Sequence, residues 1–262
     1  MNSSVNELLS LNGSCAVIIG GKGIIGYPIT EAIAEAGAIV FVASPTSNNN
    51  DKMFHKLRDK GLEVYGKQLD QSNEKQVISL IKDIEDEVNV SPNILVNSGV
   101  YRPMKKYLSD DTKKWDRSME INSRGLFITC KQFADKMKEN GGGSIINIAS
   151  IYGIVAPKKN IYDNTNIDTE PDYPYNKGGM IMFSKYMASY FAEYNVRVNC
   201  IAPGGIFNNQ DKSFVKRYID RVPMGRMGTQ NDLKGISVFL SSKASTYITG
   251  CVIPVDGGLT II

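Results

Sequence analysis

The sequence contains few of the residues on which metal sites and disulfide frameworks are built. Its 262 residues include a single histidine, His55. One histidine excludes a histidine-based metal site and the common Ser-His-Asp triad, so we expect no metal. The four cysteines, Cys15, Cys130, Cys200 and Cys251, lie far apart in or next to apolar stretches and form no CxxC motif. They are predicted to be buried, reduced thiols, as in a cytoplasmic protein.

The chain also lacks long apolar runs and a strong charge of one sign. No stretch approaches the roughly 18 apolar residues of a membrane-spanning helix. Residues 1–7 are polar and lack the basic and apolar regions of a signal peptide. Thirty Lys and Arg face 27 Asp and Glu, which leaves a net charge of +3. We therefore expect a cytoplasmic protein that binds neither membranes nor nucleic acids.

Short apolar runs rich in Val and Ile alternate with longer amphipathic stretches. Because these runs are apolar throughout, they predict parallel strands covered on both faces and joined by right-handed crossovers. The expected fold is a single α/β domain over residues 1–262, a Rossmann-type doubly wound parallel sheet of about seven strands flanked by helices. The expected strands are 15–20, 39–43, 62–67, 93–97, 144–149, 196–201 and 251–255, and the expected helices are 26–36, 51–60, 73–88, 112–140, 173–193 and 230–241.

A glycine-rich segment follows the first expected strand and opens the first expected helix. It reads Gly20-Gly21-Lys22-Gly23-Ile24-Ile25-Gly26 and contains both GxGxxG and GxxGxxG. Glycine permits the tight turn and the close approach of the main chain to a pyrophosphate, which then faces the helix amides. This context predicts a dinucleotide-binding loop rather than a turn that binds nothing. The predicted cofactor contacts are Gly20, Gly21, Lys22, Gly23, Ile25 and Gly26.

The end of the second expected strand bears on the choice between NAD and NADP. Domains that prefer NAD usually carry Asp or Glu there, which binds the ribose 2′-hydroxyl. Here the strand runs into Ser44, and no acid occurs before Asp51. Ser44 offers a hydroxyl and Lys22 a positive charge, so the sequence slightly favours NADP. No arginine follows the strand, however, and Lys22 is equally compatible with a solvated surface lysine.

In a chain with one histidine, other groups must supply acid–base chemistry. Tyr173 and Lys177 stand four residues apart at the start of an expected helix and share one face. An ammonium beside a phenol favours the phenolate. The preceding strand ends at Ser150, where open α/β sheets bind their ligands, so its hydroxyl is placed to bond a substrate oxygen. Tyr175 is the competing tyrosine, but its spacing from Lys177 makes it face away.

These segments together resemble the short-chain dehydrogenase/reductase family over nearly the whole length. The matching segments are the glycine loop, Asp70, Asn97-Ser98-Gly99, Asn122-Ser123-Arg124-Gly125, Ser150, Tyr173 to Lys177, 199–205 and Asp256-Gly257-Gly258. The resemblance implies an NAD(P)-dependent oxidoreductase that transfers hydride between the cofactor and a secondary alcohol or ketone.

The resemblance also implies roles for individual residues. Tyr173 would exchange the proton with substrate, Lys177 would also hold the nicotinamide ribose, and Ser150 would orient the substrate oxygen. Asn122 would anchor a water in a proton relay. Beyond the glycine loop and Ser44, the implied cofactor contacts are Asp70, Asn97, Ser98, Gly99, Tyr173, Lys177, Pro203, Gly204 and Ile206.

Three features depart from the family pattern. Ile19 and Ile24 replace the threonine and middle glycine of many glycine loops, and Asn97-Ser98-Gly99 is one residue shorter than usual. The third is the spacing of Ser150 and Tyr173, between which 22 residues stand. This is more than in most members.

The excess forms a polar insertion at about residues 158–171. Because both its ends are fixed at the active site, we expect it to border a polar, carbohydrate-like substrate; a solvent-exposed excursion is the alternative. Its predicted polar contacts are Asn160, Asp163, Asn164, Thr165 and Asn166, with Tyr152 or Tyr162 as the flat face for a sugar ring. Residues 204–228 form the expected substrate lid. Their Lys216-Arg217 pair either meets an anionic group or belongs to a solvated helix face.

Two other functions remain open. One is a 3-oxoacyl-carrier-protein-type ketoreductase, and the other is a non-catalytic dinucleotide-binding regulator that has kept the fold. The resemblance also implies a homodimer or homotetramer, formed through helices 112–140 and 173–193. The apolar residues Leu126, Phe127, Met182, Met187 and Phe191 belong either to that interface or only to the core.

Overall fold

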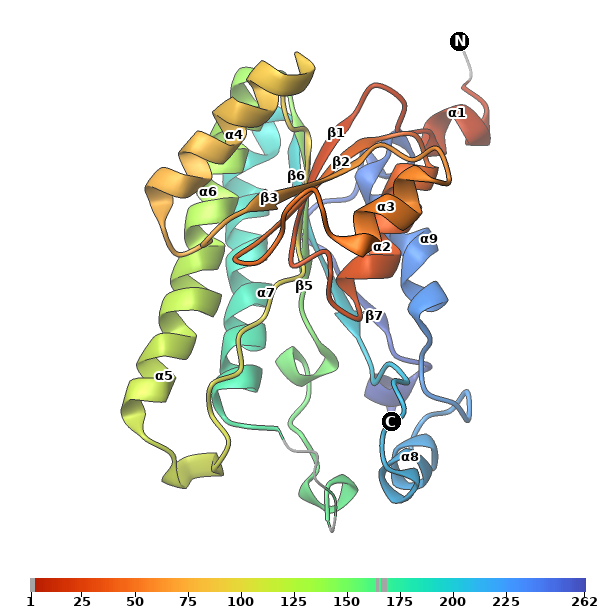
Figure 1. The fold of residues 1–262 in the computed structure, drawn as a ribbon. Helices are drawn as coiled ribbons and strands as arrows, with labels where there is room; N and C mark the ends of the chain where they lie inside the picture. The colour runs from red at the N-terminus through yellow and green to blue at the C-terminus, as the bar shows by residue number, and fades with distance from the viewer. Residues whose placement is uncertain (1–2, 164, 166–168) are drawn as a thin grey trace.

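The computed structural model, which describes residues 3–163, 165 and 169–262, contains one seven-stranded parallel sheet. Its strand order is β3-β2-β1-β4-β5-β6-β7 (Figure 1), so the chain reverses direction across the sheet between β1 and β4. In doubly wound sheets ligands bind at such a switch point, beyond the carboxyl ends of the strands. The strands are β1 (Cys15–Ile19), β2 (Ile39–Ser44), β3 (Val64–Gln68), β4 (Ile94–Asn97), β5 (Gly143–Ile148), β6 (Val196–Pro203) and β7 (Val252–Val255).

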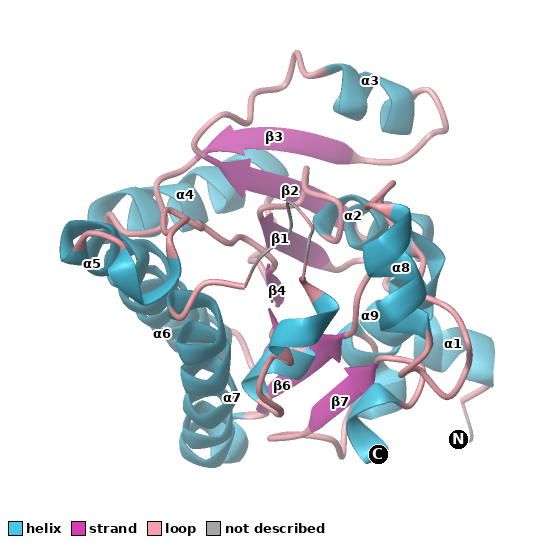
Figure 2. Cartoon of the chain, turned by 90° about the horizontal axis from the view of Figure 1, so that it is seen from below, coloured by secondary structure: helices cyan, strands magenta, loops and turns pink. Residues whose placement is uncertain are grey.

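Helices cover both faces of the sheet. The longer helices α4, α6 and α7 pack together on one face, while α2 and α9 pack on the other (Figure 1). Seen along the strands, α5 and α8 lie on opposite sides of the edge where the strands end (Figure 2). The helices are α1 (Val5–Leu9), α2 (Gly26–Glu35), α3 (Lys52–Arg58), α4 (Glu74–Val88), α5 (Thr112–Ser118), α6 (Gly125–Glu139), α7 (Asp172–Phe191), α8 (Lys212–Ile219) and α9 (Lys234–Ser241).

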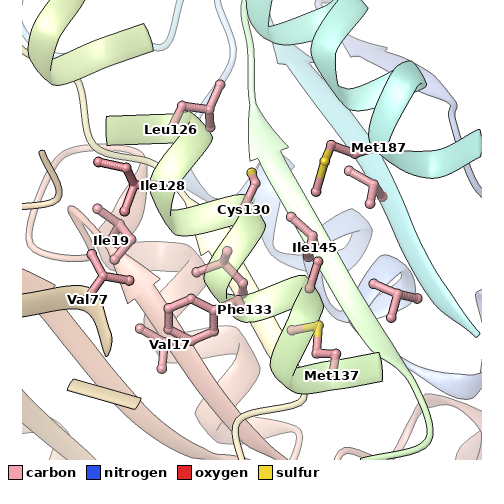
Figure 3. Packing of buried hydrophobic residues seen from close by; sticks show 14 of the residues in the cluster. Val17, Ile19, Val77, Leu126, Ile128, Cys130, Phe133, Met137, Ile145 and Met187 are labelled. Carbon is pink, nitrogen blue, oxygen red and sulfur yellow. The ribbon is translucent and has the colours of Figure 1, made fainter. Parts of the chain in front are cut away.

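Two hydrophobic clusters fix the sheet between these layers. Along β1, Val17 and Ile19 point into the cluster under α4, α6 and α7, whereas Ala16 and Ile18 point into the cluster under α2 and α9. Figure 3 shows the first cluster, in which Phe133 of α6 lies among side chains from several strands. The inner strands β2, β1, β4, β5 and β6 are therefore buried on both faces, which explains why their sequences are apolar throughout, whereas the edge strands β3 and β7 are only partly buried.

The expected strands and helices are confirmed with small shifts at their ends. The helix expected over 112–140 consists of α5, a π-helical turn at Met119–Arg124, and α6. The helix expected over 230–241 begins as a 3₁₀ turn, Gln230–Leu233. Helices α1 and α8, which are short, were not predicted from the sequence. Each begins at a capping residue, Ser4 and Asp211, so the local signal was present.

One cysteine prediction is wrong. Cys15, Cys130 and Cys200 are buried free thiols, but Cys251 is exposed. It immediately precedes β7, which pairs with β6 alone at the edge of the sheet, so within the described residues no further strand covers it. Among the described helices, none combines the length and apolarity needed to cross a membrane.

Candidate active site

The glycine loop packs main chain against main chain. Gly20 has φ +74°, and a Cβ there would lie 2.6 Å from Gly99 Cα, at the end of β4. A Cβ on Gly26 would lie 2.7 Å from Gly21 Cα, whereas Gly23 has room, with its nearest neighbour at 3.4 Å. The loop therefore forms a cradle without Cβ atoms at the switch point, which fits a dinucleotide pyrophosphate.

At the far end of this cradle, Lys22 is already paired. Its Nζ lies 3.0 Å from Asp51 Oδ2 and also donates to Thr46 O. This ion pair holds the pKa of the Asp51 carboxyl below its usual range. Ser44 Oγ lies 2.8 Å from Ser47 Oγ. Asp51, the first acid after β2, thus reaches the lysine that favoured NADP and neutralises part of its charge.

The other expected cofactor residues follow β3 and β4. Asp70 accepts hydrogen bonds from Ser72 N and Oγ, which lower the pKa of its carboxyl. Asn97 directs its amide into the core, where Nδ2 donates to Asn147 Oδ1 at 2.8 Å. Its side chain is therefore engaged in holding strands together, and a cofactor would meet its main chain.

Tyr173 and Lys177 lie together on the first turns of α7. Lys177 is 4% exposed, and its Nζ donates to Ile148 O at 2.5 Å, at the end of β5. Burial lowers the pKa of this ammonium to about 8. Lys177 Nζ lies 5.8 Å from the centroid of the Tyr173 ring, and Arg102 Cζ lies 4.6 Å from it. Tyr173 is therefore flanked by two cationic groups.

The competing Tyr175 lies elsewhere. It is 62% exposed, and its ring packs on Trp115, with centroids 5.1 Å apart. This orientation follows from helical spacing, which turns it away from Lys177.

Asn122 lies in the π-helical turn between α5 and α6. Both ends of its amide bond the main chain of Tyr101, with Tyr101 N donating to Oδ1 at 2.8 Å and Nδ2 donating to Tyr101 O at 2.7 Å. Asn122, Tyr173 and Lys177 line one small cavity. The turn thus brings Asn122 beside α7, in keeping with the frequent use of π-helical turns at functional sites.

A second cavity, of about 150 Å³, opens beside Ser150 and Tyr173. Tyr152 and Tyr162 also line it, and their hydroxyls hydrogen-bond each other. Thr169 of the expected insertion and Phe214 and Tyr218 of the expected lid also line this cavity, and among its polar and aromatic residues the sequence analysis missed only Arg102. None of these four follows a recognisable motif; they arrive through the loop after β4, the insertion and α8. Within the described residues, no carboxylate lines the cavity.

The residues at the start of the expected lid differ in whether they line the cavity or pack in the core. Pro203 and Gly204 line the cavity together with Gly205, which the sequence analysis did not select. Ile206 is 8% exposed and belongs to the hydrophobic cluster under α2 and α9. Its side chain therefore packs in the core.

The insertion and α8 are fastened to each other. Arg217 donates to Ile161 O and Asp163 O, and Arg221 donates to Asn160 Oδ1. Lys216 of α8 is exposed. Arg217 is thus occupied by main-chain carbonyls, and Asn160 faces α8. The expected contacts Asn164 and Asn166 lie outside the described residues.

Comparisons with known proteins agree with this geometry. Residues 21–260 match the protein family described as Enoyl-(Acyl carrier protein) reductase. The chain belongs to the short-chain dehydrogenase/reductase family. As a member of this family, it is an NAD(P)-dependent oxidoreductase acting on secondary alcohols and ketones.

Relatives of this dehydrogenase/reductase carry names that refer to different substrates. A tropinone reductase homolog of Arabidopsis thaliana is 29% identical over 97% of this chain and 94% of its own. A 3-oxoacyl-[acyl-carrier-protein] reductase of Aquifex aeolicus is 27% identical, covering 96% and 99% of the two chains. A 5-keto-D-gluconate 5-reductase of Escherichia coli is 25% identical, covering 98% and 99%.

Two solved structures carry cofactors. A gluconate 5-dehydrogenase from Burkholderia cenocepacia, in complex with NADP and tartrate, is 29% identical with TM-score 0.85, covering 99% of this chain and all of its own. A short-chain dehydrogenase from Leptospira borgpetersenii with bound NAD+ is 31% identical with TM-score 0.86, covering 99% and 97%. Within the described part of our chain, no group of three or more His, Cys, Asp or Glu is placed to hold a metal ion.

The buried Lys177 predicts a particular dependence of stability on pH. Its pKa is about 8 in the folded protein against an ordinary 10.5, so between these values the unfolded chain binds more protons. The free energy of unfolding contributed by this group should therefore rise with pH across that window, by roughly 3 kcal/mol in total.

Urea unfolding of the ligand-free protein from pH 7 to 10.5, beside Lys177→Met, tests this. Burial raises the pKa of Cys15 and of Cys130 without a contribution from Lys177, so their ionisation affects both proteins alike. The free energy of unfolding of the wild type, relative to that of the variant, should increase as pH rises. Parallel curves would show that Lys177 keeps its ordinary pKa.

Proposed function

We propose that Asn122, Ser150, Tyr173 and Lys177 are the catalytic residues. The observation that carries this proposal is the meeting of Tyr173 with Ser150 in one cavity and with Lys177 and Asn122 in its neighbour. The nicotinamide supplies or accepts the hydride when bound. Tyr173 exchanges a proton with the substrate oxygen, Ser150 donates a hydrogen bond to that oxygen, and Lys177 stabilises the phenolate. Asn122 anchors a water of the proton relay beside Lys177.

The cofactor contacts follow from the cradle at the switch point. We assign the pyrophosphate to the loop Gly20–Gly26 and the adenosine half to Ser44 and Asp70. Pro203 and Gly204, beside Tyr173, serve the nicotinamide half, and Lys177 the ribose. Ser44 and Lys22 favour the ribose 2′-phosphate of NADP, while the negative charge of Asp51 beside Lys22 opposes that phosphate. The balance of these charges makes NAD and NADP closely matched.

We propose a polar, carbohydrate-like substrate that carries an anionic group. The cavity combines tyrosine hydroxyls, Ser150 and Arg102, and among its described lining residues there is no carboxylate to repel an anion. A guanidinium binds a carboxylate through two parallel hydrogen bonds. The names of two relatives, a 5-keto-D-gluconate reductase and a gluconate dehydrogenase, refer to sugar acids. The insertion contributes through Tyr162 and Thr169, and residues 204–228 through Phe214 and Tyr218.

We also propose that the enzyme is a cytoplasmic homodimer or homotetramer assembled through α6 and α7. Leu126, Met187 and Phe191 are buried in the subunit core, but Phe127 and Met182 are exposed. Exposed Tyr186 and Tyr190 extend this apolar surface, which favours a subunit interface. Free thiols at all four cysteines suit a reducing compartment.

The oligomer predicts the molecular mass in solution. Sedimentation at micromolar concentration should give a mass of at least twice the 28.8 kDa of one chain. The mass of a single chain would refute the oligomer.

The role of Tyr173 predicts a sharp contrast between two tyrosines of α7. Tyr173→Phe should lower kcat by at least about 100-fold, since general acid–base catalysis contributes roughly 10²–10⁴-fold. Tyr175→Phe, the matched control, should leave kcat within about twofold because the exposed phenol reaches no cavity residue. Cofactor affinity, measured by calorimetry, should be the same in both variants. Turnover by Tyr173→Phe near the wild-type rate would contradict the assignment and revive a non-catalytic role.

The anionic substrate predicts a charge-specific effect at Arg102. With a panel of keto-sugar acids, neutral keto-sugars and acyl-thioester ketones, the wild type should prefer the acids. Arg102→Gln should raise KM for acids by about tenfold, since losing a charged hydrogen bond costs roughly 1.5–3 kcal/mol. KM for neutral sugars should change little. Lys158→Gln, which removes an exposed charge from the insertion, is the control. Preference for acyl thioesters would instead favour the ketoreductase function.

A further inference from the structure

Four buried polar side chains meet between the π-helical turn and the start of α7, and only one of them has been given a role above. Ser118 Oγ accepts hydrogen bonds from Asn122 Nδ2 at 3.0 Å and from Asn176 Nδ2 at 3.1 Å. The Ser118 hydroxyl donates its own proton to Asp172 Oδ2 at 2.5 Å. Ser118 is 0% exposed and Asp172 1%.

The direction of this network follows from what a serine can do. A hydroxyl has one proton and two lone pairs. Both lone pairs of Ser118 are taken by amide groups, so its proton must point to an acceptor that needs no proton of its own. Asp172 is that acceptor, and the network ends at its carboxylate.

The Asn122 amide has one orientation that satisfies both Ser118 and the main chain of Tyr101. Its Nδ2 donates to Ser118 Oγ and Tyr101 O, while its Oδ1 accepts from Tyr101 N. Reversal of the amide would set oxygen against Tyr101 O and nitrogen against Tyr101 N. Through Ser118, the carboxylate of Asp172 supports the amide orientation that the Tyr101 main chain also requires, and it ties the π-helical turn to the residue that precedes Tyr173.

The second carboxylate oxygen of Asp172 is directed differently. Among the described residues, no donor reaches the buried Oδ1. Asp172 lines the small cavity, of about 10 Å³, that Asn122, Tyr173 and Lys177 also line. A cavity of that size has room for about one water. A buried carboxylate oxygen without a donor is costly, so it strongly favours a water at this place.

We propose that Asp172 is a positioning residue for proton transfer, which holds Asn122 through Ser118 with one oxygen and a water in the catalytic cavity with the other. The inference rests on the proposed function, in which Asn122 and Lys177 carry the proton path. It assigns to Asp172 and Ser118 a role in kcat rather than in the binding of substrate or cofactor.

Two substitutions test the roles of the two carboxylate oxygens of Asp172 separately. Ser118→Ala breaks the network but keeps the carboxylate in the cavity. Asp172→Asn can still accept from Ser118 with its carbonyl oxygen, but it turns an N–H toward the cavity. Ser118→Thr restores the hydroxyl and serves as the rescue. Ser237→Ala, which removes an equally buried hydroxyl from α9 on the opposite face of the sheet, is the control.

We expect Ser118→Ala and Asp172→Asn each to lower kcat at least tenfold, with substrate KM and cofactor Kd within twofold of wild type. Ser118→Thr should recover most of the loss, and Ser237→Ala should show none. A loss of kcat below twofold in both variants would overturn the proposal. The proposal would also be overturned if substrate KM changed as much as kcat and the control Ser237→Ala lost as much kcat as these variants.

A measurement on the ligand-free protein tests the network without turnover. With ¹⁵N-asparagine labelling, the side-chain amide of Asn122, assigned through Asn122→Asp, should exchange with solvent slowly in wild type and in Asp172→Asn. It should exchange at least tenfold faster in Ser118→Ala. Equal exchange in wild type and Ser118→Ala would overturn the positioning role. Because this readout needs no substrate, its failure is distinct from failure of the proposed function, which Tyr173→Phe tests.

Discussion

The site depends on one hydrogen bond, from the buried Lys177 ammonium to Ile148 O at the end of β5. Burial of a charged group is expensive unless strong partners compensate for it. The cost is visible in the lowered pKa of this lysine, about 8. In return, the bond fixes the first turns of α7 against the strand that carries Ser150 at its end. Tyr173, one helical turn before Lys177, thereby comes to lie beside Ser150.

A second constraint is the contact of main chains at the switch point. Gly20 at the end of β1 faces Gly99 beyond the end of β4 so closely that Gly20 tolerates no side chain, because its Cβ would lie 2.6 Å from Gly99 Cα. Ser98 N also donates to Ile19 O, which extends the pairing of β1 and β4 past the sheet. The shortened segment Asn97-Ser98-Gly99 is compatible with the family fold for this reason. Its polar side chain, Asn97, serves the core, and its glycine leaves room for the loop.

Helical spacing and strand alternation made much of this accessible from the sequence. The apolar runs identified the strands because a parallel sheet covered by helices buries both faces of its inner strands. The choice of Tyr173 over Tyr175 needed only the helical period, and Tyr175 indeed lies on Trp115 at the surface. The exposure of Cys251 was missed because burial at an edge strand depends on which strand is last in the sheet. The ion pair of Lys22 with Asp51 was missed because the two residues belong to different elements.

What the sequence alone determined is therefore local or repetitive. It comprises the element types, the doubly wound parallel class of the sheet, the glycine loop and the pairing of Tyr173 with Lys177. Each rests on a period or a spacing within one segment. The tertiary structure alone decided what lines the cavities. Arg102 reaches Tyr173 from the loop after β4, and Tyr218 reaches the substrate cavity from α8. Asp172 meets Ser118 across 54 positions of sequence. No local pattern encodes such contacts, because they form only when separate segments are packed onto one sheet.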